Sequence, residues 1–424
     1  MEVNEASARY VRVVGYKQTE VGVIPEDWSL RQLGDVVTFL DGRRRPVKDA
    51  DRAKMRGSIP YYGASGIVDY VNDYLFDEDL ILLGEDGENI LSRNCHLVFR
   101  ISGKAWVNNH AHVLKPNPNV SIGFLTGYLE SLNYERFNSG TAQPKLNKQT
   151  CVGIPVALPP TKAEQEAIAE ALSDADALIE SLEQLLVKKR RIKQGAMQEL
   201  LTGKRRLPGF SGEWEVKRLG ETAILKARIG WQGLTTAEYL DSGDYYLVTG
   251  TEFRKGYVDW NSCHYVDESR YRQDKYIQLK EHDVLVTKDG TIGKVALIAN
   301  LPRSATLNSG VFVIRPIEDA FNPVFFYYLL CSNVFTEFLT QLSAGSTINH
   351  LYQKDFVSFT YRTPEAIKEQ TAIATILSDM DAELTALEDK LDKARAIKQG
   401  MMQELLTGRI RLVGPKRTAG CTIC

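Results

Sequence analysis

The chain has 424 residues, of which 43% are hydrophobic and 25% are charged, and its formal net charge is −2. This composition is typical of a soluble globular protein with two to three domains. The near-zero net charge excludes a global attraction to nucleic acid, so any nucleic-acid surface must be a local patch. No apolar run approaches the ~20 residues that a membrane span needs, and the charged start is unlike a secretory signal. We therefore expect a cytoplasmic protein.

The cysteines also favour the reducing cytoplasm. The cysteines scattered singly along the chain are Cys95, Cys151, Cys263 and Cys331. This spacing fits free thiols better than a disulfide framework. Cys421 and Cys424 form a CxxC pair in the segment TAGCTIC, without a βαβ context. We interpret this pair as part of an unstructured end rather than as a redox or metal site.

Residues 1–23 are a polar lead-in without periodicity, and residues 24–160 form the first globular module. The module opens with IPEDWSLRQLGDVV and continues with short β-rich runs such as DLILLG, CHLVFRI and AHVLKP. Such runs favour strands, and the Gly, Asn and Asp residues between them favour turns. We predict a module of the α+β class.

Residues 161–206 are predicted to form one long helix. Apolar residues recur in steps of three and four, which is the a/d seam of a coiled coil rather than the broad apolar face of a globular helix. A helix of about 38 residues would be on the order of 57 Å long. The seam residues of this helix are Ile168, Leu172, Ile179, Leu182 and Leu186.

The second half of the chain repeats this order. Residues 207–364 form a second module, in which Trp214 matches Trp28 of the first module at an offset of 186 residues. Residues 365–408 form a second long helix, and residues 409–424 form a C-terminal tail. The seam residues of the second helix are Ile373, Leu377, Leu384, Leu387 and Leu391.

The two long helices are copies of each other. Glu164–Gly203 aligns with Glu369–Gly408 without a gap at an offset of 205 residues, and about 26 of the 40 aligned positions are identical, which indicates a duplicated unit. Two such helices most simply bury their seams against each other. The predicted fold is therefore α+β, with two globular modules alternating with two long helices that pair as an antiparallel coiled coil, in an internal pseudo-twofold repeat.

We find no sequence motif for catalysis. The segment Gly290–Val295 lacks the spacing and the hydroxyl of a phosphate loop, and no GxGxxG follows a predicted strand. His110 and His112 alternate on one strand face without a third ligand nearby, so hydrogen bonds or a surface contact are favoured over a metal. The acidic clusters Asp77–Asp79 and Glu85–Asp86 resemble nuclease carboxylates, but their spacing is not shared between the modules. The absence of a duplicated polar constellation indicates a binding protein without catalytic residues.

Nucleic acid is the favoured ligand, because basic and amide side chains gather in two loops of each module. Arg and Lys there would meet phosphates or guanine edges, and Gln would meet an adenine edge. A charge run is also often no more than a solvated face. The candidate residues of the first module are Arg43, Arg44, Arg45, Lys48, Gln143, Lys145 and Asn147. Those of the second module are Lys226, Arg228, Trp231, Gln232, Asn349, His350, Tyr352 and Lys354.

The sequence resembles the specificity subunit of type I restriction-modification systems. The resemblance is carried by the two module openings, by PP-x3-EQ-x2-IA from Pro159 to Ala169, by the SD-x-D step at Ser173 and Ser378, and by IKQG-x-MQELLTG at both helix ends. It spans essentially the whole chain.

This resemblance implies that each module is a target recognition domain that binds one half of a bipartite site on double-stranded DNA. The helices would set the spacing and dock two methyltransferase (modification) subunits, and motor-nuclease (restriction) subunits would complete the complex. It implies no cofactor or metal in this chain, with S-adenosylmethionine, ATP and magnesium on the partner subunits. One alternative is a coiled-coil scaffold or dimerisation protein with two modules that do not bind DNA. Another is a stand-alone nuclease or methyltransferase.

Overall fold

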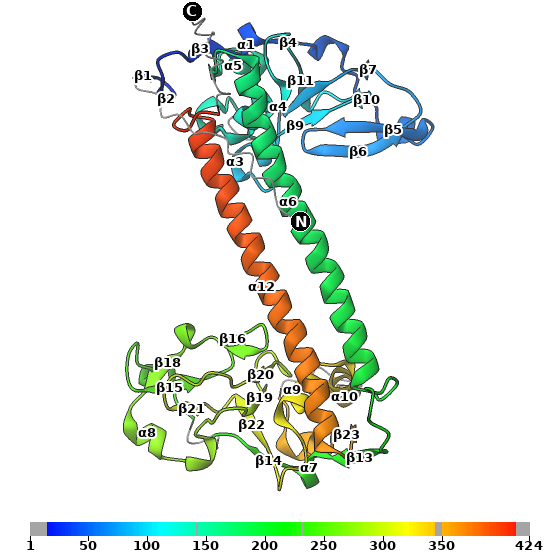
Figure 1. The fold of residues 1–424 in the computed structure, drawn as a ribbon, viewed down its shortest axis with the longest axis vertical. Helices are drawn as coiled ribbons and strands as arrows, with labels where there is room; N and C mark the ends of the chain where they lie inside the picture. The colour runs from blue at the N-terminus through cyan, green and yellow to red at the C-terminus, as the bar shows by residue number, and fades with distance from the viewer. Residues whose placement is uncertain (1–14, 141–142, 230–232, 344–349, 413–424) are drawn as a thin grey trace, which may run out of the picture. The chain divides into compact units, whose positions relative to one another are not determined.

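The protein divides into two compact units, which are described separately (Figure 1). In the computed structural model the described residues are 15–140, 143–229, 233–343 and 350–412. Unit 1 comprises Met1–Glu183 and Asp389–Cys424, and unit 2 comprises Gln184–Glu388. Each unit therefore contains one module and a part of each long helix. Within the described ranges, no helix is both long enough and apolar enough to cross a bilayer.

Two four-stranded sheets form the centre of the module in unit 1. Their strands are β4 (Val37–Phe39), β5 (Arg56–Gly63), β6 (Gly66–Val71), β7 (Phe76–Asp77), β8 (Leu80–Gly84), β9 (Val98–Ile101), β10 (Lys104–Val107) and β11 (Ala111–Pro116). The strand orders are β4-β11-β8-β9 and β6-β5-β10-β7. In the first sheet β11 pairs antiparallel with β4 and β8, so Leu114 lies between Phe39 and Ile81. In the second sheet β5 runs parallel to β10.

Strand β8 is buried on both of its faces. Ile81 and Leu83 belong to one apolar cluster, which also contains Phe124 of helix α4 (Ile122–Ser131). Leu80 and Leu82 belong to a second cluster on the opposite face of the strand. A strand covered on both sides needs apolar residues at every position. This explains why the run DLILLG does not alternate between apolar and polar residues.

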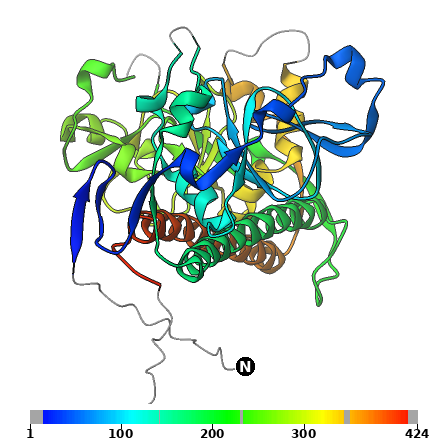
Figure 2. The same cartoon turned by 90° about the horizontal axis from the view of Figure 1, so that it is seen from above.

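Shorter elements complete the module. They are β1 (Tyr16–Thr19), β2 (Gly22–Pro25), β3 (Ser29–Gln32), α1 (Leu33–Val36), α2 (Asp49–Arg52), α3 (Asn89–Ser92), α5 (Lys148–Val152) and β12 (Pro155–Leu158). The β1–β2 hairpin, dark blue in Figure 2, contains part of the segment 1–23 that we predict as a lead-in. Residues 409–412 of the predicted tail are described, and Ile410 and Leu412 pack against the core of unit 1. Cys421 and Cys424 lie outside the described residues.

The module of unit 2 repeats this topology. Its elements are β13 (Trp214–Arg218), α7 (Leu219–Thr222), β14 (Ala223–Lys226), β15 (Tyr245–Val248), β16 (Phe253–Arg254), β17 (Tyr257–Val258), β18 (His264–Val266), α8 (Glu268–Arg272), β19 (Val284–Thr287), β20 (Val295–Leu297), β21 (Ala305–Leu307), β22 (Val311–Pro316), α9 (Pro323–Leu330), α10 (Asn333–Leu342), α11 (Gln353–Phe356) and β23 (Thr360–Pro364). The order β14-β22-β19-β20 corresponds to β4-β11-β8-β9, and β18-β15-β21 corresponds to β6-β5-β10. The hairpin β16–β17 extends the larger sheet.

The long helices are α6 (Lys162–Leu200) and α12 (Ile367–Leu405), each of 39 residues. After each helix the chain turns at a glycine, with φ of +72° at Gly203 and +69° at Gly408, a conformation that favours glycine. A Cβ on Gly203 would lie 3.0 Å from the ring of Trp214, and one on Gly408 would lie 3.1 Å from Trp28. The repeated LLTG sequence is therefore explained by a close approach to the repeated tryptophan.

Ion pairs join α6 to α12 within each unit, at matching places. In unit 2, Arg190 lies 2.7 Å from Glu388, and in unit 1, Arg395 lies 2.6 Å from Glu183. These four residues are related by the repeat offset of 205 residues. The pairs Lys193–Asp381 and Lys398–Asp176 repeat the relationship. The predicted α+β class, with two modules and long helices, is confirmed.

The predicted seam residues are buried or half-buried. The buried ones are Ile168, Leu172, Leu186, Ile373, Leu377, Leu387 and Leu391. The half-buried ones are Ile179, Leu182 and Leu384.

Candidate nucleic-acid interface

Backbone hydrogen bonds join four polar loops in unit 1. The loops are residues 41–48 after β4, 85–87 after β8, 108–110 between β10 and β11, and 143–147 before α5. Glu85 N donates to His110 O (2.8 Å), Leu146 N donates to Glu85 O (2.7 Å), and Arg45 N donates to Val107 O (3.2 Å). We call these residues the unit 1 loop cluster. It brings together the two loops in which the sequence predicts DNA contacts.

The same arrangement occurs in unit 2. The loops are residues 226–229 after β14, 288–290 after β19, 308–310 between β21 and β22, and 350–354 at the start of α11. Lys288 N donates to Gly310 O (2.8 Å), and Leu351 N donates to Lys288 O (2.9 Å). We call these residues the unit 2 loop cluster. Two modules with one topology thus carry polar loops at one equivalent place, with different side chains.

A buried histidine lies under the unit 1 loop cluster. His112 is 1% exposed, and its Nδ1 lies 2.8 Å from Asp41 Oδ2 while its Nε2 lies 2.8 Å from the carbonyl oxygen of Leu146. Burial is the largest single effect and lowers the pKa of His112, but the interactions with Asp41, Cys151 and the backbone of Leu146 together outweigh it, and the pKa rises to about 10. Both ring nitrogens therefore donate, and the charged ring ties two loops together. The described part of the chain contains no group of three His, Cys, Asp or Glu side chains that would hold a metal ion.

Two of the three consecutive arginines are held by the module itself. Arg44 lies 2.7 Å from the carboxylate of Glu85 and donates to the carbonyl oxygen of Ala111 (2.8 Å). Arg43 lies 2.9 Å from the carboxylate of Glu78. Their positive charges are thus already paired. Arg44 in particular stabilises the conformation of the loop.

Arg45 and Lys48 differ from these two arginines. Both side chains are exposed, and no ion pair or side-chain hydrogen bond within the described ranges involves either of them. The backbone of Arg45 is fixed, because its carbonyl oxygen accepts a hydrogen bond from the indole of Trp106 (2.7 Å). These are the cations of the 41–48 loop that remain available to a ligand.

The second loop of the unit 1 cluster contains three candidate residues. Gln143 is exposed, and Lys145 Nζ lies 3.5 Å from the carboxylate of Glu85, with the lysine side chain 49% exposed. Asn147 caps helix α5, because its side chain accepts a hydrogen bond from the backbone of Thr150 (2.8 Å). Gln143 is therefore available to a ligand, and Lys145 is half-exposed but shares its charge with Glu85. Asn147 instead caps a helix.

In unit 2 the structure separates Arg228 from the other candidates. Arg228 is 1% exposed and donates to the carbonyl oxygen of Leu307 (2.8 Å) and to Gln273 Oε1 (2.9 Å). Burial lowers the pKa of this guanidinium. The side chain holds residues 270–273 against the sheet and is not displayed at the surface.

The remaining candidates of unit 2 are exposed or half-buried. The exposed ones are Lys226, Tyr352 and Lys354, and His350 is half-buried. Lys354 Nζ lies 5.6 Å from the centre of the Tyr352 ring, within the range of a cation–π contact. Trp231, Gln232 and Asn349 lie outside the described residues.

The sequence analysis overlooked one repeated polar feature. Asp86 and Asp289 follow β8 and β19 at equivalent positions, and each forms an isolated bridge to the last loop of its cluster, at Lys145 and His350 respectively. The expectation that no polar residue pattern is duplicated is therefore wrong. The dipeptide Asp-Gly recurs at 86–87 and 289–290, at an offset of 203 residues, and is the sequence signal of this repeat.

Repeated modules with repeated polar loops define a duplicated binding protein, and comparison with known proteins identifies its family. The family model for the type I restriction modification DNA specificity domain matches residues 25–188 and again residues 211–394. The two matches cover more than half of the chain. The chain therefore belongs to the type I restriction-modification DNA specificity family.

Individual relatives agree with this family. A type I restriction enzyme specificity subunit of Haemophilus influenzae is 27% identical over 372 residues, which are 86% of this chain and 90% of the relative. The MjaVIII specificity subunit of Methanocaldococcus jannaschii is 25% identical over 421 residues, or 92% and 94% of the two chains. Among solved structures, an S subunit from M. genitalium matches with a TM-score of 0.62 at 15% identity, covering 89% and 96% of the two chains. At that identity the structural match demonstrates a shared fold.

Proposed function

We propose that this chain is the DNA sequence-recognition subunit of a type I restriction-modification complex, and that each module binds one half of a bipartite target. The observation that carries the proposal is the repeated loop cluster, which has the same backbone frame in both modules and different side chains. A duplicated frame with divergent surfaces suits two different half-sites. The double match to the DNA specificity domain supports the same function.

The exposed side chains of the clusters suit the two kinds of contact that such a protein needs. Arg45, Lys48 and Lys145 in unit 1 would neutralise phosphates, which fixes position without reading sequence. Gln143 would donate to and accept from a base edge in the major groove. A chain with a formal net charge of −2 must concentrate this basic character locally. In unit 2, Lys226 would meet phosphates in the same way.

We further propose that α6 and α12 pair as an antiparallel coiled coil that sets the distance between the half-sites. Within each unit the ion pairs run in opposite order along the two helices, since Arg190 meets Glu388 whereas Lys193 meets Asp381. The buried seam supports the same pairing. A helix of 39 residues is about 58 Å long, so a change in its length would alter the preferred spacer.

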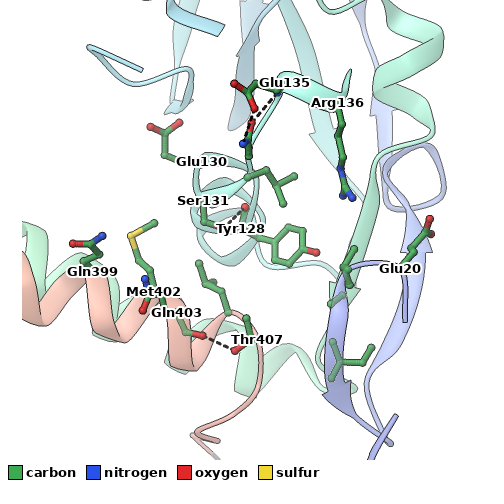
Figure 3. Close-up of a pocket in the computed structure, with 16 residues that line it drawn as sticks. Glu20, Tyr128, Glu130, Ser131, Glu135, Arg136, Gln399, Met402, Gln403 and Thr407 are labelled. Carbon is green, nitrogen blue, oxygen red and sulfur yellow. Dashed lines mark hydrogen bonds between the residues drawn. The ribbon is translucent and has the colours of Figure 1, made fainter. Parts of the chain in front are cut away.

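A groove beside the end of each long helix suits the docking of partner subunits. In unit 1, α12 and α4 line a groove of about 980 Å³, shown in Figure 3 with Met402, Gln403 and Tyr128. In unit 2, the end of α6 and the residues after α9 line a groove of about 660 Å³. The residues that line both grooves at the repeat offset are Gln194 and Gln399, Met197 and Met402, Gln198 and Gln403, and Thr202 and Thr407.

A helix glycine next to each groove supports the same role. Gly195 and Gly400 stand five residues before the ends of α6 and α12, and a Cβ added at either would meet nothing within 4 Å. Glycine in a helix interior costs roughly 0.5–1 kcal/mol relative to alanine, so its presence in both copies calls for a reason outside the chain. We propose that one methyltransferase subunit places backbone against each glycine. Two equivalent sites then bind two copies of the same partner.

In this proposal the chain supplies recognition and its partners supply chemistry in the cytoplasm. The methyltransferase subunits would hold S-adenosylmethionine, and the motor-nuclease subunits would use ATP and magnesium. The test is single-molecule methylation mapping of DNA from cells that express the methyltransferase with or without this chain. The proposal expects a two-part asymmetric motif that depends on this chain. No such motif from an assembled complex would contradict it and favour a scaffold role.

A further inference from the structure

Each loop cluster contains a histidine bound to an aspartate. In unit 1, His110 Nδ1 lies 2.9 Å from both carboxylate oxygens of Asp86. In unit 2, His350 Nδ1 contacts the carboxylate of Asp289. Asp86 and Asp289 each stand two residues after the end of equivalent strands, β8 and β19. The same pair therefore occurs at the same place in both modules.

The two histidines come from different parts of the fold. Gly310 occupies the place of His110 in unit 2, because each residue's carbonyl oxygen accepts the backbone hydrogen bond from the loop after β8 or β19. Lys145 occupies the place of His350 in unit 1, because each forms the isolated bridge to the aspartate. Shared packing thus does not account for the rings. Both modules contain an imidazole bound to the equivalent aspartate, although the two histidines occupy different positions in the fold.

Both histidine side chains are partly exposed. The side chain of His110 is 50% exposed and that of His350 is 30% exposed. No hydrogen bond to the Nε2 of either ring occurs among the described residues, whereas both nitrogens of the neighbouring His112 are occupied. When such a ring is neutral and Nδ1 gives its hydrogen to the carboxylate, Nε2 presents a lone pair. In that form each ring has one hydrogen-bond acceptor, held in place by the aspartate.

The chemistry of the pair selects its ligand. The carboxylate of Asp86 lies 2.9 Å from the ring of His110 and repels a phosphate, and in the proposed function the exposed lysines contact the phosphates. The exocyclic amino groups of cytosine and adenine are donors in the major groove and need an acceptor. We propose that His110 and His350 are specificity-determining residues, each of which accepts a hydrogen bond from the amino group of one base. Asp86 and Asp289 are the positioning residues. This inference rests on the proposed function and names the base edge that each module reads.

The test uses the full chain assembled with its methyltransferase subunits. Methylation rates are measured on a set of DNA duplexes in which each position of the wild-type target is replaced in turn. His110→Ala is expected to lower discrimination at one position of one half-site roughly tenfold, as loss of one base hydrogen bond implies. The other half-site stays unchanged. His350→Ala is expected to do the same in the other half-site.

A matched control is available in unit 1. His96 Nδ1 lies 3.1 Å from the carboxylate of Glu130, and its side chain is 75% exposed, but it lies outside the loop cluster. His96→Ala removes the same kind of pair and is expected to leave discrimination unchanged at every position. Thermal unfolding of each variant checks that the module remains folded.

A substitution of Asp86 tests whether this residue orients the His110 ring or only stabilises the loop. In Asp86→Asn the amide can accept from His110 Nδ1 through its oxygen or donate to it through its nitrogen; in the second case the ring hydrogen moves to Nε2 and the acceptor becomes a donor. The preferred base at the affected position should then change from one with an amino group to one with a carbonyl group, such as thymine or guanine. A loop that had merely lost support would not acquire a new preference.

Three outcomes separate the hypotheses. Unchanged discrimination in both histidine variants overturns the inference, while a wild-type bipartite motif keeps the proposed function. A uniform loss of affinity for all sequences, together with a slope of log affinity against log salt concentration that is smaller by about 1, indicates a phosphate contact and also overturns the inference. A wild-type complex that recognises no bipartite motif contradicts the proposed function itself.

Discussion

Arg411, which follows α12, forms a buried ion pair with Glu164 in the first turn of α6. The distance from Arg411 Nη2 to Glu164 Oε2 is 2.7 Å, and each side chain is 2% exposed. In unit 2, Arg206 and Glu369 form the same pair, with a distance of 2.7 Å between Nη2 and Oε2. Both pairs are related by the repeat offset of 205 residues. Each copy of the repeat thus supplies the arginine to one unit and the glutamate to the other.

We predict that Glu164→Gln destabilises unit 1 more than Glu369→Gln destabilises unit 2. Removing one partner of a buried pair costs up to about 3 kcal/mol because the other charge stays buried, although Arg411 keeps its ion pair with Asp27 at 2.8 Å. Arg206 is 27% exposed, so water can compensate part of its loss. Urea unfolding followed by tryptophan fluorescence measures both changes. Equal destabilisation by the two substitutions would contradict the difference in burial.

The stability of unit 1 should fall as the pH rises above neutrality. His112 has a pKa of about 10 in the folded chain against an ordinary value of 6.5. The folded state therefore keeps a proton that the unfolded state loses between these two pH values, so its stabilisation is complete below pH 6.5 and lost by about pH 10. His112→Gln should remove this decline. Urea unfolding across pH 6 to 10, with His96→Ala as the control that retains the decline, measures the effect.

Substitutions of the neighbouring Arg44 and Arg45 should affect different properties, namely the stability of the module and its affinity for DNA. Arg45→Ala is expected to weaken binding to all DNA sequences and to lower the salt slope by about 1, because one phosphate contact is lost. Arg44→Ala is expected to destabilise the module, because Glu85 then loses its 2.7 Å partner. Binding titrations at several salt concentrations and thermal unfolding distinguish the two effects. Loss of stability in Arg45→Ala with an unchanged salt slope would refute the assignment.

Replacing the helix glycines should raise the stability of the chain and weaken its assembly with partner subunits. Gly400→Ala is expected to stabilise unit 1 by roughly 0.5–1 kcal/mol, because alanine favours the helix and its Cβ finds open space. The same change should weaken binding of one methyltransferase subunit, and Gly195→Ala should weaken binding of the other. Titration of the assembled complex by native mass spectrometry measures occupancy. Full occupancy with both glycines replaced would exclude docking at this face.

The period of the helices made the scaffold predictable. Seam residues such as Leu186 and Leu391 are set by local heptad spacing, and both are buried. The turn after each helix was less visible, because Gly408 is required by its positive φ and by the close approach of Pro25 and Trp28, which are hundreds of residues earlier in the sequence. The heptad spacing of a helix can be read directly from a sequence. A contact between distant residues leaves only a repeated residue, such as the glycine after each helix, whose cause the sequence does not show.

The candidate interface was harder to predict for the same reason. Arg44 and Arg228 lie in loops whose composition suits DNA binding. Their partners, however, are Glu85 and Leu307, which lie 41 and 79 residues away in the chain. No local pattern signals that a charge is already paired. The aspartates of the two clusters escaped detection because the offset between the modules changes along the chain, from 186 residues at Trp28 to 203 at Asp86.

The central claim is that each module reads its own half of the target. The most direct test replaces residues 24–160 by the corresponding module of a relative with a different target, leaving both long helices unchanged. Methylation mapping should then reveal a motif with one new half, one original half and the original spacer length. A motif changed in both halves, or in its spacer, would contradict independent recognition by two modules on one helical frame.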